Sequence, residues 1–165
     1  MRVAFLDRDG TIICDYPDEE WRNIREPVFI EGVFDALRHI KRLGYEIIIA
    51  TNQYLIGEGI ISQLDYYAFN EKFLNTLRAQ GIDVLDVFFC PHARSSHCNC
   101  CKPKPGLIQQ ALDKYPDIDP NDSFMAGDSR ADMQLAEDMG LKFVGVGLEC
   151  PKRIPSIRDI NTISL

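Results

Sequence analysis

Five short runs of mostly apolar residues divide this chain of 165 residues, and each has the length of one buried strand. Apolar runs without strict alternation are typical of strands that are covered on both faces, as in a parallel sheet. The sequence therefore predicts five strands. They are expected over residues 3–6, 45–51, 84–89, 123–126 and 142–146.

Helical patterns fill most of the gaps between these runs. Apolar residues recur every three or four positions from Val33 and again from Tyr66, and a glycine closes each pattern. Pro105 suits the first turn of a third helix, and a fourth is expected over residues 130–139. The alternation of strand and helix predicts an α/β fold with a doubly wound parallel sheet, in which helices cover both faces.

The length of the chain leaves room for one domain. A chain of 165 residues, 45% of them hydrophobic, buries roughly two thirds of its unfolded surface on folding, so one core is enough. The connecting segments are too short to hold a separate cap domain. We therefore expect residues 1–165 to form a single domain with an open active site, and we draw nothing from the tail beyond Gly147.

The net charge of −7 argues against a nucleic acid or an anionic membrane as the partner, because no long basic run offsets it. A phosphate ligand must then be met by local positive charge. No leader of signal-peptide type precedes the first strand, and no apolar run approaches the roughly 20 residues of a membrane span. A cytoplasmic protein with a small-molecule partner is expected.

Polar side chains follow three of the predicted strands. Asp7 and Asp9 come directly after the first strand, and alternation along an extended chain points both to the same side. Thr51 and Asn52 end the second strand, and Asp128 follows the fourth. Because the carboxyl ends of parallel strands share one edge, where ligands of such sheets bind, these side chains are expected to converge.

Lys102, just before Pro103, would add an ammonium group to these three carboxylates, one hydroxyl and one amide. Such a set suits a magnesium-bound phosphate, with hard oxygen ligands for the ion and donors for the phosphoryl oxygens. Lys104, on the other side of Pro103, competes for the same role.

Cysteines are concentrated in one loop, at about residues 90–101, which favours a metal site over a disulfide framework. The loop offers four soft ligands of the kind that a tetrahedral zinc requires, and four protein ligands make a structural site, not a catalytic one. Cys101 could replace Cys100, and unligated thiols or a redox disulfide are the alternatives to zinc. The expected ligands are Cys90, His92, Cys98 and Cys100.

The run DRDGT at residues 7–11 resembles the DxDGT signature of the haloacid dehalogenase superfamily. Thr51, Lys102 and the pair Asp128 and Asp132 resemble its other motifs, in order, and the resemblance covers about the first 150 residues. The TNQ triplet and the Cys-Pro-His run followed by Cys-x-Cys and Lys-Pro are similar to the branch that contains histidinol-phosphate phosphatase and heptose-bisphosphate phosphatase.

This resemblance implies that Asp7 is the nucleophile and forms an aspartyl-phosphate, with Asp9 as general acid and base. Magnesium would bind the carboxylates of Asp7 and Asp128 and the backbone carbonyl of Asp9. Thr51 and the Asn52 backbone N–H would hold phosphoryl oxygens.

Two further roles follow from the same resemblance. Lys102 would balance the developing charge, and Asp132 would orient Lys102 or a metal-bound water from behind. Arg8, by contrast, is interpreted as a structural ion-pair partner.

The chain departs from that branch at positions that bear on substrate binding. Cys101 stands where an arginine typically precedes the motif lysine, and Ser129 stands where a basic residue commonly follows the motif aspartate. Glu58 lies where the heptose enzymes tend to carry an arginine, which argues against a second phosphate nearby. Trp21 and Tyr54 lie in adjacent loops, where they either stack on a substrate or cover a core edge.

The resemblance therefore implies a magnesium-dependent phosphomonoester hydrolase of a small metabolite, such as a sugar phosphate or a bisphosphate like D,D-heptose 1,7-bisphosphate. Histidinol phosphate is the alternative substrate, because the gap of six from His92 to Cys98 gives the short zinc loop of that type. A catalytically silent phosphate-binding protein is the interpretation from another class.

Overall fold

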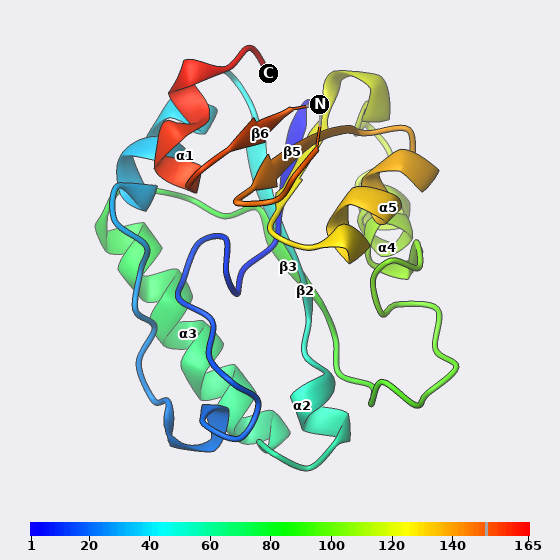
Figure 1. Ribbon diagram of the computed structural model, residues 1–165. Coiled ribbons are helices and arrows are strands. Elements are labelled where there is room, and N and C mark those ends of the chain that lie inside the picture. Colours follow the sequence, from blue (N-terminus) through cyan, green and yellow to red (C-terminus); the bar gives the residue numbers. More distant parts are fainter. Residues whose placement is uncertain (151) are drawn as a thin grey trace.

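The computed structural model describes residues 1–150 and 152–165 and contains one parallel sheet of six strands in the order β3-β2-β1-β4-β5-β6 (Figure 1). No helix among the described residues combines the length and hydropathy that a membrane crossing requires. The strands are β1 (Val3–Leu6), β2 (Glu46–Asn52), β3 (Asp86–Cys90), β4 (Phe124–Gly127), β5 (Lys142–Val146) and β6 (Arg153–Ile154). The helices are α1 (Val33–Arg42), α2 (Tyr54–Gly57), α3 (Gln63–Ala79), α4 (Gly106–Lys114) and α5 (Arg130–Asp138), with short 3-10 helices η1 (Trp21–Asn23), η2 (Pro120–Asp122) and η3 (Ile157–Thr162).

Strand β1 lies in the middle of the sheet, because it is apolar at all four positions and all four side chains are buried. Its neighbours are β2 on one side and β4 on the other, both parallel to it. In register, Leu6 pairs with Ile49 of β2 and Ala126 of β4, so the carboxyl ends of the three strands lie at one edge. The expected convergence of their polar tips follows from this order.

Helices cover both faces of the sheet, and the doubly wound α/β prediction is confirmed. On one face α1 and α3 pack with η3, through side chains such as Leu37, Phe73 and Ile160. On the other face α4 and α5 pack through Leu107 and Leu135. The two sets lie on opposite sides of the sheet in Figure 1. Burial of both faces explains why the strands carry apolar runs instead of an alternating pattern.

The strand ends differ from the predicted ranges by one or two residues. The third strand begins at Asp86 instead of residue 84, and the fourth covers Phe124–Gly127 instead of 123–126. The apolar pattern reports burial, whereas the hydrogen-bonded ladder sets the ends, so the two need not coincide. Two helical turns were not expected at all: α2 lies in the loop after β2, and η1 interrupts the loop after β1.

The tail beyond Gly147, for which no structure was predicted, forms β6 and η3. Ile154 extends the sheet at its edge, and Ile157 and Ile160 are fully buried against the face that α1 covers. The tail is therefore part of the core.

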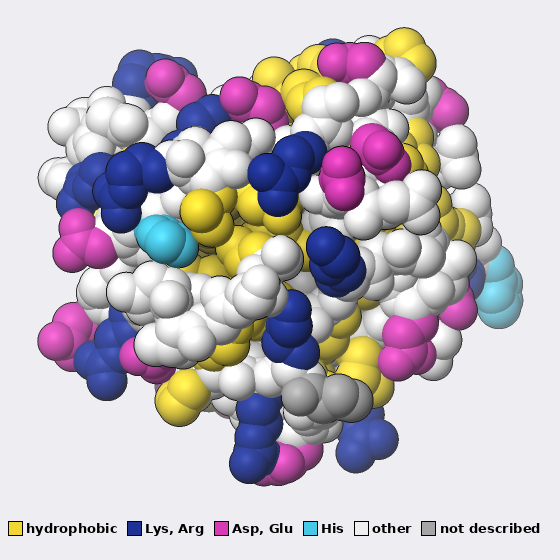
Figure 2. All heavy atoms as spheres, turned by 90° about the horizontal axis from the view of Figure 1, so that it is seen from above, with side chains coloured by type: hydrophobic (Ala, Val, Ile, Leu, Met, Phe, Trp, Pro, Cys, Tyr) yellow, Lys and Arg dark blue, Asp and Glu magenta, His cyan; other side chains and the backbone are white. Residues whose placement is uncertain are grey.

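On the face that carries both termini, apolar side chains gather in a hollow surrounded by charged ones (Figure 2).

Candidate active site

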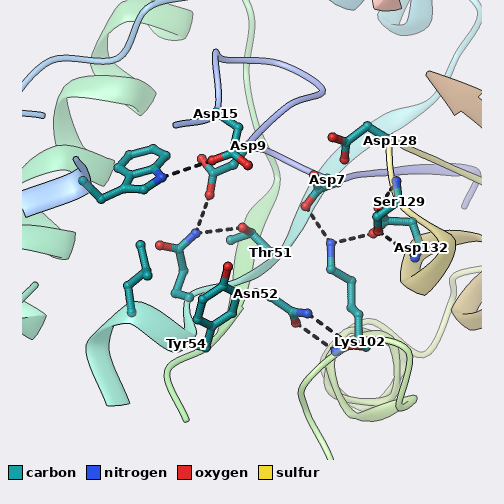
Figure 3. A pocket seen from close by; sticks show the side chains of 13 residues that line it. Asp7, Asp9, Asp15, Thr51, Asn52, Tyr54, Lys102, Asp128, Ser129 and Asp132 are labelled. Carbon is teal, nitrogen blue, oxygen red and sulfur yellow. Dashed lines mark hydrogen bonds and ion pairs between the residues drawn. The ribbon is translucent and has the colours of Figure 1, made fainter. Parts of the chain in front are cut away.

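A buried ion-pair chain joins the tip of β1 and the first turn of α5 to the loop before α4. The Nζ of Lys102 donates to Asp7 Oδ1 at 2.6 Å and lies 2.7 Å from Asp132 Oδ1 (Figure 3). It also donates to the Ala50 carbonyl at 2.7 Å. All three charged side chains are almost fully buried. One ammonium therefore lies between two carboxylates in a site with little access for water.

Burial and crowding of carboxylates shift the pKa values of this site. Burial raises the pKa of Asp7 well above its usual value, and Lys102 acts in the opposite direction. Burial and the neighbouring Asp132 raise the pKa of Asp128 to about 6. Burial disfavours the ammonium of Lys102, but Asp7 and Asp132 outweigh it and raise its pKa. The site has more negative charge than one lysine balances, which is what a cation site requires.

Three carboxylates could share a metal ion here. Asp7, Asp128 and Asp132 each offer an oxygen, and these oxygens lie within 4.8 Å of one another. Among the described residues, no other side chain donates a hydrogen bond to the Asp128 carboxylate, which faces the pocket (Figure 3). Gly10 brings the chain close to this group, since a Cβ there would lie 2.1 Å from Asp128 Oδ2. The donor set, all hard oxygens, fits Mg²⁺.

Asp9 is held from behind by two side chains. Arg8 forms a bidentate ion pair with it, in which Nε donates to Asp9 Oδ1 at 2.8 Å and Nη2 donates to Asp9 Oδ2 at 3.0 Å. The Arg8 side chain is only 1% exposed. The Gln53 amide donates to Asp9 Oδ2 at 2.7 Å and to the Thr51 hydroxyl at 2.9 Å. The structural ion pair expected for Arg8 is present. Asp9 and Thr51 are thereby fixed relative to each other at the pocket.

Asn52 fixes the lysine through the backbone. Its side-chain oxygen accepts from the Lys102 N–H at 2.8 Å, and its amide nitrogen donates to the Lys102 carbonyl at 3.1 Å. Lys104, the competing lysine, is exposed and donates to the Cys98 carbonyl, so it lies outside the pocket. Lys102 is the lysine that reaches the carboxylates.

The Asp132 carboxylate binds two neighbouring residues. One oxygen pairs with Lys102, and the other accepts from the Ser129 hydroxyl and N–H in a capping box at the start of α5. This cap fixes the first turn of the helix that follows Asp128. Gly127 allows the close approach, because a Cβ there would lie 2.5 Å from the Asp132 carboxylate. The expected position of Asp132 behind Lys102 matches this geometry.

These groups line one pocket of about 260 Å³. Trp21 and Tyr54 both lie in its wall, and so does Asp15, which belongs to the loop after β1. The Trp21 indole N–H donates to Asp15 at 3.1 Å, and burial raises the pKa of Asp15. Trp21 is also part of the core, as the second interpretation expected, whereas its stacking on a substrate stays a prediction. The lining consists of Asp7, Asp9, Asp15, Trp21, Thr51, Asn52, Gln53, Tyr54, Leu55, Lys102, Asp128, Ser129 and Asp132.

The four expected zinc ligands lie together in the loop after β3. The Sγ of Cys90 is 3.5 Å from His92 Nδ1 and 3.6 Å from Cys98 Sγ, and Cys100 Sγ is 3.1 Å from the same histidine nitrogen. Ligand atoms around a tetrahedral zinc with Zn–S bonds of about 2.3 Å are about 3.8 Å apart. The cluster has this size, and it includes Cys100 instead of Cys101.

The remaining candidates lie elsewhere. His97 is exposed and His39 is half-buried on α1, and neither belongs to a cluster of metal-ligating side chains among the described residues. Glu58 pairs at 2.8 Å with Arg94 in the loop at residues 90–101, which we call the zinc loop after its expected ligands. Sequence reasoning assigned no role to Gln53, Asp15 or Arg94. The TNQ triplet could have indicated Gln53, but nothing in the pattern distinguished Arg94 from an ordinary loop residue.

Comparison with known proteins identifies relatives over most of the chain. A family model for haloacid dehalogenase-like hydrolases matches residues 18–140. The chain is 38% identical over 148 residues to D-glycero-alpha-D-manno-heptose-1,7-bisphosphate 7-phosphatase of Photorhabdus laumondii, covering 86% of this chain and 79% of that protein. It is 35% identical over 147 residues to the corresponding beta-heptose enzyme of Pasteurella multocida, covering 86% and 78%.

Solved structures share the fold. The crystal structure of D,D-heptose 1,7-bisphosphate phosphatase from B. bronchiseptica, complexed with magnesium and phosphate, matches with a TM-score of 0.84 at 23% identity, over 98% of this chain and 97% of that one. The corresponding enzyme from Burkholderia thailandensis matches with a TM-score of 0.69 at 22% identity, over 96% and 94%. The doubly wound sheet is thus the fold of both enzymes.

Proposed function

This chain belongs to the haloacid dehalogenase-like hydrolases and is a phosphatase, and we propose that it hydrolyses a sugar phosphate through an aspartyl-phosphate on Asp7. The observation that carries this mechanism is the buried chain of Asp7, Lys102 and Asp132 at the floor of the pocket. A carboxylate whose oxygen is aimed into a pocket, beside a lysine that can neutralise a phosphate, is suited to nucleophilic attack on phosphorus.

Asp9 acts as the general acid and the general base in this proposal. In the first step an Asp7 oxygen bonds to phosphorus, the ester P–O bond breaks, and Asp9 gives its proton to the leaving oxygen. In the second step Asp9 takes a proton from water, which attacks phosphorus and releases inorganic phosphate from Asp7. Its bonds to Arg8 and Gln53 fix the carboxylate beside Thr51 and the pocket, and, as an acceptor at both oxygens, Asp9 is arranged for the second step, in which it is the base.

Thr51, the Asn52 backbone and Lys102 hold the phosphoryl oxygens. The hydroxyl of Thr51 is fixed by Gln53, and the Lys102 backbone is fixed by the Asn52 side chain, so the donors are oriented before a substrate arrives. Donors that need no rearrangement stabilise the charge of the transition state most effectively. Asp132 keeps the Lys102 ammonium in place from the side opposite to Asp7.

Mg²⁺ is the metal that we propose for the carboxylate group. Asp7 and Asp128, together with the backbone carbonyl of Asp9, would hold it, and Asp132 lies close enough to orient a bound water. When bound, the ion neutralises carboxylate charge that would repel a phosphate dianion. The crowded carboxylates and the raised pKa of Asp128 support a cation at this position.

Zinc is the ion proposed for the thiol cluster of Cys90, His92, Cys98 and Cys100. Its four ligands leave no open position, so the ion would stabilise the loop that leads into Lys102 instead of taking part in the reaction. A thiolate site also needs reduced cysteines, which is the state that the cytoplasm maintains. We therefore propose a cytoplasmic enzyme.

Heptose 1,7-bisphosphate is the first substrate to test, because the relatives that cover most of the chain are named for it. Their names differ in the anomer, so both anomers belong in the test. Histidinol phosphate is the second candidate, because the short loop of six positions between His92 and Cys98 favours it.

The decisive experiment is steady-state kinetics with Mg²⁺ across a panel of phosphate esters, with Asp7→Asn as the matched variant. Asparagine keeps the size of the side chain and removes the nucleophile, so turnover of every ester should fall to background while the fold is retained. Turnover by Asp7→Asn, or a wild-type protein that releases phosphate from no ester, would exclude the proposed reaction.

A further inference from the structure

One guanidinium joins three segments at the rim of the pocket. Arg94, in the zinc loop, donates to both oxygens of Glu58 at 2.8 Å and to Asp18 at 2.9 Å. Its guanidinium carbon lies 4.2 Å from the centre of the Tyr54 ring. Asp18 belongs to the loop after β1, and Glu58 directly follows α2. We call Asp18, Tyr54, Glu58 and Arg94 the rim cluster.

One member of the rim cluster lies in the wall that a substrate meets. Tyr54 lines the pocket (Figure 3), and its hydroxyl donates to Asp18 at 3.0 Å. Arg94 stacks on this same ring, outside the pocket lining, and is 56% exposed. A cation at such a position would be well placed to bind a second anionic group of a substrate.

Arg94 is not free to do so, because two carboxylates hold it. The cluster contains one guanidinium and two carboxylates, so its formal charge is −1. Hydrogen bonds from Arg94 lower the pKa of Glu58, which keeps that carboxylate charged at neutral pH. The second anion of a substrate would therefore meet a cation whose charge is already more than balanced.

Within the described part of the chain, the interior of the pocket offers no cation besides Lys102. Five carboxylates and this one ammonium line it, and Arg8 balances Asp9 from behind the lining, so the net formal charge is −3, which one Mg²⁺ would reduce to −1. Lys102 is itself engaged by Asp7 and Asp132. The transferred phosphoryl group would contact both Lys102 and Mg²⁺, so no positive charge in the pocket would be left for another anion. A second phosphate would add two more negative charges with no partner.

We infer that this pocket selects phosphate esters whose remaining part carries no second phosphate, and that Glu58 and Asp18 together determine this specificity because they more than neutralise Arg94. This inference rests on the proposed phosphatase reaction and narrows its substrates to monoesters with neutral leaving groups. It also means that heptose 7-phosphate should be a better substrate than heptose 1,7-bisphosphate.

A charge series at fixed geometry tests the inference with those two esters, which differ only in the phosphate at C1. Arg94→Gln, the wild type, Glu58→Gln and the double variant Asp18→Asn with Glu58→Gln give the rim cluster formal charges of −2, −1, 0 and +1. Each change keeps the approximate size of the side chain, and Asp18→Asn retains a side-chain oxygen that can accept from Tyr54. The measured quantity is kcat/KM for the bisphosphate divided by kcat/KM for the monophosphate.

The ratio should be below one in the wild type and rise along the series, by on the order of fivefold for each unit of charge at low ionic strength. The increase should be mainly in the KM of the bisphosphate, and added salt should reduce it, because screening acts on charge and not on shape. Glu71→Gln, which removes one exposed charge on α3 outside the pocket, should leave the ratio at the wild-type value.

Two results would overturn the inference: a ratio that does not follow the charge of the rim cluster, or a wild-type preference for the bisphosphate that Arg130→Gln removes. Arg130 is the exposed cation next to Ser129, and in that case it would be the group that binds the second phosphate. Failure of the proposed reaction itself looks different, since neither ester would then be hydrolysed. Melting temperatures of all variants report whether each one is folded.

Discussion

At the scale of single residues, the pocket is organised by a lysine that is almost fully buried. Lys102 is paired with Asp7 and Asp132, and its own backbone is bonded to Asn52. Charges buried in this way stabilise a fold only as a complete set, because removal of one partner leaves the others without compensation. We therefore expect the same lysine to be needed both for the stability of the pocket and for the binding of phosphate.

Lys102→Met should therefore affect stability and turnover together. The loss of the ammonium leaves Asp7 and Asp132 buried side by side, which should lower the free energy of unfolding by about 3–5 kcal/mol without metal. Turnover should fall to near background. Urea unfolding and phosphate release measure the two effects. Lys104→Met is the matched control, since Lys104 is exposed and should leave both quantities nearly unchanged.

At the scale of elements, the zinc loop connects two otherwise distant parts of the molecule. It begins at the end of β3 and leads directly into Lys102, and Arg94 in its middle contacts the loops around Tyr54. The loop has few apolar side chains to hold its shape, so a metal ion would supply most of its stability. If the ion holds this loop in one conformation, it would fix the positions of both Lys102 and Arg94 at the pocket.

Removal of zinc should accordingly lower both thermal stability and turnover. His92→Ala, or a zinc chelator applied to the wild type, should reduce the melting temperature by several degrees and weaken phosphate release, with Mg²⁺ present throughout. Zinc content measured by metal analysis should fall in parallel. His97→Ala is the matched control, since His97 lies in the same loop outside the cluster. Unchanged stability and turnover in zinc-free protein would contradict the proposed role.

The edge strand β3 gives a pH-dependent prediction. Burial disfavours the charge on Asp86, but hydrogen bonds from Lys114, the Val87 N–H and Tyr115 outweigh burial and lower the pKa of Asp86 below its usual value. A carboxyl group with a lowered folded-state pKa stabilises the protein above its unfolded pKa of about 4, and this contribution disappears as the pH falls through the folded-state value.

Asp86→Asn should thus lower the free energy of unfolding by less than about 1 kcal/mol at pH 7, because the partner Lys114 is largely exposed. The cost should shrink below pH 4 and be absent near pH 2, as urea unfolding at a series of pH values would measure. Asp83→Asn, an exposed carboxylate with no ion pair among the described residues, should show no such trend. A cost that grows in acid would have the wrong sign.

At the scale of the whole molecule, the sequence predicted what burial determines and missed what single contacts determine. The apolar runs predicted the parallel sheet, and the polar residues at the strand tips predicted that Asp7, Thr51 and Asp128 lie at one pocket. The contacts of Arg94 with Glu58 and Asp18 depend on how three loops meet, across up to 76 positions, and no local pattern encodes them. The tail escaped prediction for a related reason, since its short elements have too few residues for a periodic signal.

We propose that residues 1–165 unfold as one unit, and the tail tests this. Ile160 is fully buried on η3 against the face that α1 covers, far along the chain from the pocket residues. Ile160→Ala should lower the free energy of unfolding by about 2–5 kcal/mol, as for other buried large-to-small changes, in a single transition.

Circular dichroism and tryptophan fluorescence should report the same transition midpoint for Ile160→Ala, because Trp21 lies in the same core cluster as Ile160. Below that transition, turnover should equal that of the wild type. Asn161→Ala, an exposed neighbour, should leave stability unchanged. If the tail unfolded first, in a separate step that left Trp21 and turnover unaffected, the core would not be one unit. The mutation would then cost little at the main transition, since the sheet with α1 and α3 would be stable without η3.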